Sequence, residues 1–407
     1  MKTFQNLLMA FVGFVAKIFF LLYKLMATLV VVGIGAYFFW VLYLYGFCLI
    51  FNNAEFQRNW QYSLPALTIG LLLAVIGPLR KKDNPYRIYR AGLAGTIDEC
   101  ADGFIAWIGT LKYFTSPLSI AEDPGSYKIT GREIRDLIDG RLQPGDILLR
   151  GYRGYLDGIM IGLTGGGQGL GKYFSHAAFY LGEVNDGEDQ MIVARRLETM
   201  NRETGLWEPA SDEEKKAIRN NRDYYQPGKQ MVVHSMTRGV FSEDILTFTR
   251  CDYLAVLRLP KVIMLTPEDR KEDKSLIKEL PEDAEAIHER LMKGGTVSGE
   301  EVFKIARLSA LGKIGSCYDF QFNDIKTANR FSCSEFVYYC YKSVHCYLGL
   351  LPKAHAFLKV FFKRTTISPA DIYDAAISKG KLEIVWTSDS LKQPQGRPQP
   401  VPAPAVE

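Results

Sequence analysis

Long uncharged hydrophobic runs occur only in the first 79 residues of the chain, and the remainder mixes polar and apolar positions. Residues 26–51 form one run without a charged side chain, and residues 59–79 form another. A helix needs about 20 apolar residues to cross a bilayer, so each run is long enough. Only residues 52–58, a short polar link, separate the two runs. We therefore predict a transmembrane hairpin over residues 26–82, with spans at about 26–51 and 60–79.

Residues 1–25 are also apolar, but Lys17 and Lys24 interrupt them. Lysines at this spacing can extend their charged ends to water from a helix that lies in the membrane interface. A cleaved signal peptide is the alternative, although no small-residue cleavage site is followed by a polar mature start.

The charges that flank the predicted hairpin indicate its orientation. Three lysines precede the first span, whereas the link between the spans carries only Arg58. Five basic residues follow the second span: Arg80, Lys81, Lys82, Arg87 and Arg90. Because positive charges stay on the cytoplasmic side, we expect both ends of this multi-pass membrane protein, and its soluble domain, in the cytoplasm.

The pattern after residue 82 predicts a helical connector over residues 83–140, followed by a mixed α and β region. Residues 97–114 and 131–142 carry apolar side chains at helical spacing. Short β-rich segments bounded by Gly, Pro or Asp predict four strands, at 146–150, 176–181, 230–235 and 253–259. Further helices are expected at 281–292 and 298–311 and from about Cys333, the second with a Ser298–Glu301 capping box.

Two polar segments interrupt or end this region. Residues 184–229 contain a dense run of charges and are predicted to be an exposed insertion. Residues 389–407 are rich in proline and are predicted to be an extended, disordered tail, which is a candidate segment for binding a protein partner.

Composition excludes several classes of function. The 407 residues include 49 basic and 45 acidic side chains. The resulting net charge of +4 does not indicate a basic surface that would bind nucleic acid. The seven cysteines are odd in number and form no CxxC pair, which argues against a disulfide framework or a zinc ribbon. The sequence thus calls for no metal and no cofactor.

Three local motifs carry the candidate chemistry: residues 142–149 (LQPGDILL), residues 174–181 (FSHAAFYL), and Cys317-Tyr318-Asp319 with residues 330–336 (RFSCSEF). A thiol reacts as the thiolate, and both a helix N-terminus and a nearby imidazole lower its pKa. Cys333 has the first feature by its position, and His176 would supply the second. We therefore predict Cys333 as nucleophile and His176 as its base.

The order of these motifs resembles the circularly permuted papain-like cysteine hydrolases of the NlpC superfamily. The branch that the chain resembles is that of the YiiX/YaeF-like amidases, which is related to lecithin retinol acyltransferase. In this family the histidine precedes the cysteine, as His176 precedes Cys333. The resemblance covers residues 143–342 and implies an α+β domain at about 141–388, with a small antiparallel sheet packed on helices.

The resemblance also implies a third catalytic residue, on the strand that follows the histidine strand. That position falls on His234, where relatives often carry an acid or another histidine. A histidine there can hold the tautomer of His176. The backbone N–H of Cys333 is the expected oxyanion donor, with Tyr318 as a further candidate. The alternatives are a structural thiol for Cys333 and core or capping histidines for His176 and His234.

These assignments predict a membrane-anchored cysteine hydrolase or acyltransferase that acts through an acyl-enzyme on an amide, ester or thioester bond. A cytoplasmic domain favours acylated lipids or lipid-modified proteins as substrates, whereas an outward-facing domain favours a cell-wall peptide endopeptidase or amidase. An inactive membrane adaptor is the alternative from another class. No role is expected for the remaining histidines and helix cysteines: His288, His345, His355, Cys340 and Cys346.

Overall fold

The computed structural model of the chain describes residues 111–115, 118–122, 127–155, 161, 169–201, 204, 206–271, 282–319, 328–350, 352 and 366–392. The chain divides into two compact units, and nearly all described residues belong to the one that includes residues 121–407. The predicted N-terminal helix and both predicted membrane spans lie outside the described residues. Within the described ranges, no helix is long and apolar enough to cross a membrane.

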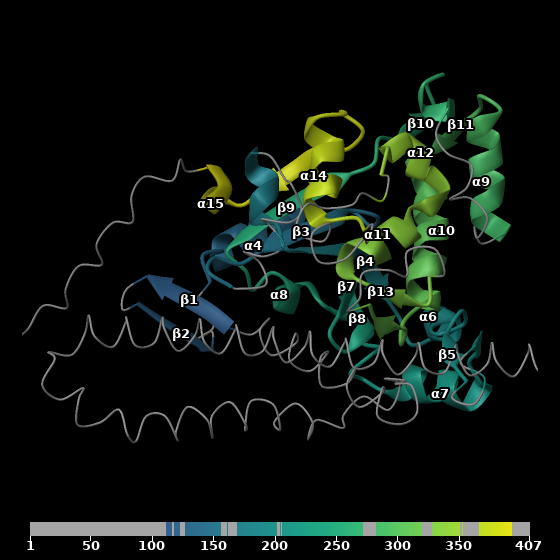
Figure 1. Ribbon diagram of the computed structural model, residues 1–407, viewed down its shortest axis with the longest axis horizontal. Coiled ribbons are helices and arrows are strands. Elements are labelled where there is room, and N and C mark those ends of the chain that lie inside the picture. The colour runs from purple at the N-terminus through teal and green to yellow at the C-terminus, as the bar shows by residue number, and fades with distance from the viewer. Residues whose placement is uncertain are drawn as a thin grey trace, which may run out of the picture. The chain divides into compact units, whose positions relative to one another are not determined.

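A six-stranded antiparallel sheet in the order β14-β9-β3-β4-β7-β8 organises the larger unit (Figure 1). Its strands are β3 (Ile147–Gly151), β4 (His176–Val184), β7 (Gly228–Met236), β8 (Gly239–Asp244), β9 (Tyr253–Arg258) and β14 (Glu383–Thr387). All four predicted strands are present, and the prediction of an α+β fold with an antiparallel sheet packed on helices is confirmed at this level.

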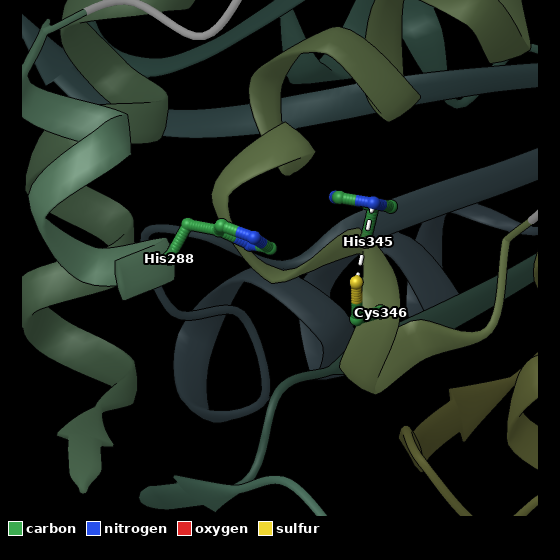
Figure 2. A group of neighbouring side chains, drawn as sticks. All are labelled: His288, His345 and Cys346. Atoms are coloured by element: carbon green, nitrogen blue, oxygen red, sulfur yellow. Dashed lines mark hydrogen bonds between the residues drawn. The ribbon is translucent and has the colours of Figure 1, made fainter. Parts of the chain in front are cut away.

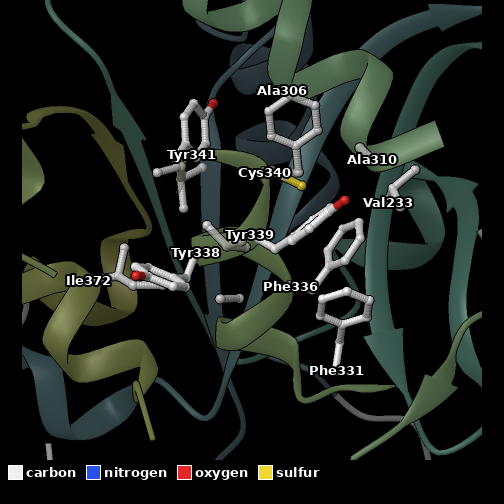
Figure 3. Packing of buried hydrophobic residues seen from close by; sticks show 14 of the residues in the cluster. Val233, Ala306, Ala310, Phe331, Phe336, Tyr338, Tyr339, Cys340, Tyr341 and Ile372 are labelled. Carbon is white, nitrogen blue, oxygen red and sulfur yellow. The ribbon is translucent and has the colours of Figure 1, made fainter. Parts of the chain in front are cut away.

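The two faces of the sheet support two separate hydrophobic clusters, because successive side chains of a strand point to opposite faces. On the first face, Ala177 and Phe179 pack with α10 (Gly299–Gly312), α11 (Cys333–Cys340) and α14 (Pro369–Ile377). On the second face, Ala178 and Tyr180 pack with α4 (Gly131–Gly140) and α8 (Ile245–Phe248). Figure 3 shows the first cluster around α11, whose aromatic side chains lie between α10, α14 and β7.

Shorter elements surround this framework. They are β1 (Leu111–Thr115), β2 (Leu118–Glu122), η1 (Gly169–Tyr173), α6 (Glu188–Ile192), β5 (Glu198–Met200), β6 (Trp207–Pro209), α7 (Asp212–Asn220), β10 (Val262–Met264), η2 (Asp269–Lys271), α9 (Glu282–Met292), β11 (Thr296–Ser298), β12 (Cys317–Tyr318), β13 (Arg330–Phe331), η4 (Lys342–Val344), α12 (His345–Leu348) and α15 (Asp389–Lys392). The pairs β1-β2, β5-β6, β10-β11 and β12-β13 each form a two-stranded sheet.

Two of the predicted helices, α10 and α11, begin at side-chain caps. Ser298 accepts from the backbone N–H of Glu301, and the Glu301 side chain accepts in return from the N–H of Ser298, so the predicted capping box of α10 is confirmed. Ser332 and Glu335 form the same box at the start of α11. A box of this kind satisfies N–H groups that a helix start otherwise leaves unpaired.

Three expectations are wrong in part. The prediction of a helix over 97–114 is wrong from Leu111, where β1 begins, because the last residues of this segment are aromatic and compatible with a strand as well as a helix. The segment 184–229 is not simply an exposed insertion, since Val193, Ile218 and Tyr225 are fully buried in the first cluster. The first residues of the predicted disordered tail, Asp389–Lys392, form the short helix α15.

The turn between β7 and β8 depends on a glycine. Gly239 has a φ of +101°, and a Cβ at this position would lie 2.2 Å from the carbonyl oxygen of Ser316. We predict that Gly239→Ala lowers the free energy of unfolding by more than about 2 kcal/mol, because it adds this clash to the cost of about 1–2 kcal/mol for a left-handed residue. Urea denaturation measures the effect. Gly140→Ala is the matched control, since its Cβ meets nothing within 4 Å; equal loss in both variants would contradict the prediction.

Candidate active site

Four ionisable side chains form a row across the second face of the sheet. Arg150 lies opposite His176 in the β3–β4 pairing, and Val232 lies opposite Glu243 in the β7–β8 pairing. Strand alternation puts His234 on the same face as Val232, which packs in the second cluster. The row therefore crosses four neighbouring strands, β3, β4, β7 and β8, each of which contributes one residue.

The members of this row contact one another directly. Nε2 of His176 lies 2.7 Å from Nδ1 of His234, and both imidazoles are buried. On its other side, Nε2 of His234 lies 3.2 Å from Oε1 of Glu243, an ion-pair contact whose N–H direction is not aligned for a strong hydrogen bond. The same carboxylate oxygen is 3.6 Å from Nη1 of Arg150.

The contact with Glu243 favours one tautomer of each imidazole. The Glu243 carboxylate favours a proton on the facing nitrogen, Nε2 of His234, which leaves Nδ1 of a neutral His234 as an acceptor. Nε2 of His176 must then donate the proton of the 2.7 Å hydrogen bond. Nδ1 of His176 consequently carries a free lone pair, which is the requirement for a general base.

Helix α8 covers the row with an aromatic side chain. Phe248 lies edge-on to His234, with ring centroids 5.4 Å apart, and within 6.0 Å of the ring of His176. Arg150 stacks over the same ring at 4.2 Å and donates to the backbone carbonyl of Phe248. The row is therefore enclosed by apolar and polar contacts from one short helix.

Burial determines the charges of the row. Desolvation, reinforced by the positive charge of Arg150, lowers the pKa of His176 well below 6.5. Desolvation also lowers the pKa of His234, although Glu243 opposes this shift. Burial alone would raise the pKa of Glu243, but His234, Arg150 and Arg238 outweigh it and lower the pKa. At neutral pH the two imidazoles of the row are neutral and Glu243 is a carboxylate.

Cys333 occupies the first position of α11, as the sequence predicts. The Ser332–Glu335 capping box holds this helix start, and the hydroxyl of Thr366 donates to Glu335 at 2.8 Å. The hydroxyl of Ser235, the residue after His234, donates to the carbonyl of Phe331 at 2.6 Å. This bond ties the strand that carries His234 to the backbone that leads into Cys333.

The thiol of Cys333 reaches β4 at its first residue. Sγ lies 3.9 Å from the carbonyl oxygen of Ser175, and the backbone of Ala177 also hydrogen-bonds to the thiol. The thiol thus contacts the main chain on both sides of His176. The body of α11 packs on the first face, whereas the imidazole of His176 points to the second. Among the described residues, no hydrogen bond joins the thiol to this imidazole.

The expectation that the helix start lowers the pKa of Cys333 is wrong for this structure. Burial raises the pKa of the thiol, and its hydrogen bonds to Ala177 and Ser334 compensate only in part. The nearby Glu335 also disfavours a thiolate, and burial together with Asp319 raises the pKa of this carboxyl to about 7. The free energy that desolvation costs the thiolate is larger than the stabilisation that the helix dipole provides. Cys333 is therefore a protonated thiol at neutral pH.

Tyr318 lies near the nucleophile through its strand pairing. Strand β12 runs parallel to β13 and places Tyr318 opposite Phe331, two residues before Cys333. The structure thus brings all four predicted site residues, Cys333, His176, His234 and Tyr318, into one region around the start of β4 and α11.

Sequence reasoning missed Arg150, Ser235 and Glu243. Glu243 had a detectable signal, because a hairpin through Thr237 and Gly239 puts it diagonal to His234 on the same face. Arg150 is likewise an inward charge at the end of an otherwise apolar strand.

Comparison of the chain with family models, with curated proteins and with solved structures gives no match.

Substitution of Glu243 tests whether its carboxylate determines the tautomer of His176. We predict that Glu243→Gln releases the tautomer of His176, so that ring ¹⁵N spectra of histidine-labelled protein lose the signature of an unprotonated Nδ1. The rate of Cys333 acylation should fall by about ten- to a thousandfold, less than the roughly ten-thousandfold seen when a triad loses its third member. Glu183→Gln on β4 is the control, since Glu183 is exposed. An unchanged ¹⁵N spectrum in a folded Glu243→Gln protein would show that the carboxylate does not orient the row.

Proposed function

We propose that this chain is a membrane-anchored cysteine hydrolase or acyltransferase that forms an acyl-enzyme on Cys333. The observation that carries the proposal is the buried Glu243–His234–His176 row, which ends at His176, next in the chain to Ser175, whose carbonyl the thiol of Cys333 contacts. A buried imidazole pair is costly unless its hydrogen bonds are satisfied, and this pair leaves Nδ1 of His176 as a basic nitrogen without a proton.

The proposed reaction begins with a neutral thiol and a neutral imidazole. The thiol proton passes to Nδ1 of His176 as Sγ attacks the carbonyl carbon of the substrate. Backbone N–H groups at the start of α11 stabilise the oxyanion, since the first N–H groups of a helix have no acceptor within it. The imidazolium then protonates the leaving amine, alcohol or thiol. Water or another acceptor releases the acyl group in the second half-reaction.

His234 and Glu243 are positioning residues in this mechanism. When His176 takes the thiol proton, its positive charge lies 2.7 Å from His234, which accepts the Nε2 proton and is itself polarised by the carboxylate. The thiol and the imidazole must approach each other before transfer, by rotation of either side chain. Catalytic hydrogen bonds of ligand-free sites are commonly long and shorten when substrate binds.

We further propose that the domain has the permuted papain-like topology of the NlpC superfamily. In support, the histidine strand precedes the nucleophile helix, the next strand pairing with it carries His234, and α11 packs on β4. The motifs in residues 174–181 and 330–336 occur at these two elements.

Substrate class follows from the proposed membrane anchor. With the domain in the cytoplasm, an acylated lipid or a lipid-modified protein in the inner leaflet is within reach, and the bilayer is the first partner. A domain on the outer side would instead favour a cell-wall peptide. A topology reporter fused after residue 407 discriminates between these two substrate classes, because the positive-inside asymmetry predicts the cytoplasm.

Acylation of the thiol by an activated ester tests the proposed activity without a natural substrate. We predict that a limiting amount of a nitrophenyl ester modifies Cys333 first, and that His176→Gln slows this modification by at least about a hundredfold, the lower range of general-base catalysis. Mass spectrometry of the peptides locates the acyl group. Cys340→Ser is the control, since burial places the pKa of Cys340 well above 9.0.

Cys317 is the competing thiol, because it is only half-buried. Modification shared between Cys317 and Cys333 and indifferent to His176→Gln would contradict the proposed activity. That result would favour the alternative of a membrane adaptor without catalysis.

A further inference from the structure

A second group of thiol and imidazole side chains lies apart from the candidate active site. Figure 2 shows His288 on α9 facing His345 and Cys346, the first two residues of α12. The exposed fractions of the three residues are 4%, 1% and 2%. Each offers one ligand atom, and the three atoms all lie within 4.8 Å of one another. Two segments that are distant in sequence therefore place three donors around one point in the interior.

The hydrogen bonds of His345 prepare one of its nitrogens as a ligand. Nδ1 lies 2.7 Å from the carbonyl oxygen of Lys342 and donates to it. The other nitrogen, Nε2, then carries a lone pair and lies 3.2 Å from Sγ of Cys346. Histidines that bind metals in proteins have this arrangement, in which the outer nitrogen donates to a carbonyl and fixes the ring.

The distances are close to those of a tetrahedral zinc site. With Zn–S at about 2.3 Å and Zn–N at about 2.0–2.1 Å, the sulfur and a nitrogen of one tetrahedron are about 3.6 Å apart. The observed separation between Sγ and Nε2 is shorter by a few tenths of an ångström, so a small widening admits the ion. The imidazole of His288 stacks at 5.5 Å from that of His345 and must both shift by up to about 1.5 Å and rotate, because a nitrogen lone pair lies in the plane of its ring.

The environment of His288 also favours a ligand. This imidazole is buried, and its ring stacks on that of His345. Desolvation lowers the pKa of His288 and lowers that of His345 to about 4, so both rings are neutral, as ligands must be.

We propose that His288, His345 and Cys346 bind a Zn²⁺ ion that joins α9 to the segment following α11. On binding, the thiol of Cys346 loses its proton to solvent and the thiolate takes its place beside the ion. Two imidazoles and one thiolate form a donor set that zinc accepts, and a water completes the tetrahedron. The ion would join two segments that are distant in sequence, and α11, which carries Cys333, ends at Cys340, just before η4 and α12.

The positions of the three ligands explain why no zinc motif is recognised in the sequence. The ligands are a neighbouring His–Cys pair and one histidine from a separate helix, rather than the paired CxxC spacing by which zinc sites are recognised. Only the packing of α9 against η4 and α12 brings the three together.

Cobalt and zinc titration of the full-length protein, first stripped with a chelator, tests the proposal. We expect one equivalent of Co²⁺ to bind with a thiolate-to-metal charge-transfer band, and Zn²⁺ to displace it. Cys346→Ala should abolish the band, and His288→Gln and His345→Gln should each weaken zinc binding by at least about a hundredfold, more than is usual for losing an outer partner of a ligand.

Two further variants separate this site from the other thiols. Cys333→Ser and Cys340→Ser should keep the charge-transfer band, because neither residue belongs to the cluster. A band lost in Cys333→Ser would place the metal at the candidate active site and overturn the proposal. So would a band absent from the wild type or retained in Cys346→Ala.

Thermal unfolding keeps the proposal testable if a variant folds poorly. The wild type should melt at a higher temperature with Zn²⁺ than with chelator, because a ligand that binds only the folded state stabilises it. An identical melting temperature in both conditions would also overturn the proposal.

Discussion

Burial of the His176–His234–Glu243 row is the constraint on which the candidate site depends. Two imidazoles and a carboxylate are removed from water between the sheet and Phe248, where one hydrogen bond and one ion-pair contact join them. The backbone register of four strands brings these groups together. The same desolvation that threatens stability keeps His176 neutral and leaves its Nδ1 as a base.

Desolvation also changes the chemistry expected of the cysteine. A thiol at an exposed helix start gains from the dipole and ionises readily, but Cys333 is 6% exposed and lies next to the acidic Glu335. The result is a neutral pair rather than a thiolate and an imidazolium. Such a pair does not react indiscriminately with electrophiles, and its proton transfer is coupled to attack on a carbonyl. Specificity then depends on how a substrate brings Sγ and Nδ1 together.

The sequence predicted the parts of this arrangement that depend on local pattern. Short β-rich segments bounded by Gly, Pro or Asp located β4 and β7, and the Ser298–Glu301 capping box located the start of α10. Glu243 and Arg150 were not predicted as site residues. Their roles depend on which strands are neighbours in the sheet, and the order of strands in a sheet cannot be inferred from a local sequence motif. The raised pKa of Cys333 was missed for a similar reason: burial is a property of the packed helix and cannot be inferred from its position in the chain. The burial of Ile218 and Tyr225 was not predicted either, because charged residues surround them in the sequence and indicated an exposed segment.

The pH dependence of Cys333 acylation tests the neutral-pair account most directly. A neutral thiol that gives its proton to His176 should react at a nearly constant second-order rate from about pH 8 to about pH 6, because the pKa of His176 lies well below 6.5 and that of the thiol lies above its usual value. Acylation by an activated ester, followed by mass spectrometry, measures the rate. A rate that instead rises about tenfold with each pH unit across this range would show attack by a free thiolate in equilibrium with solvent, and would contradict the account.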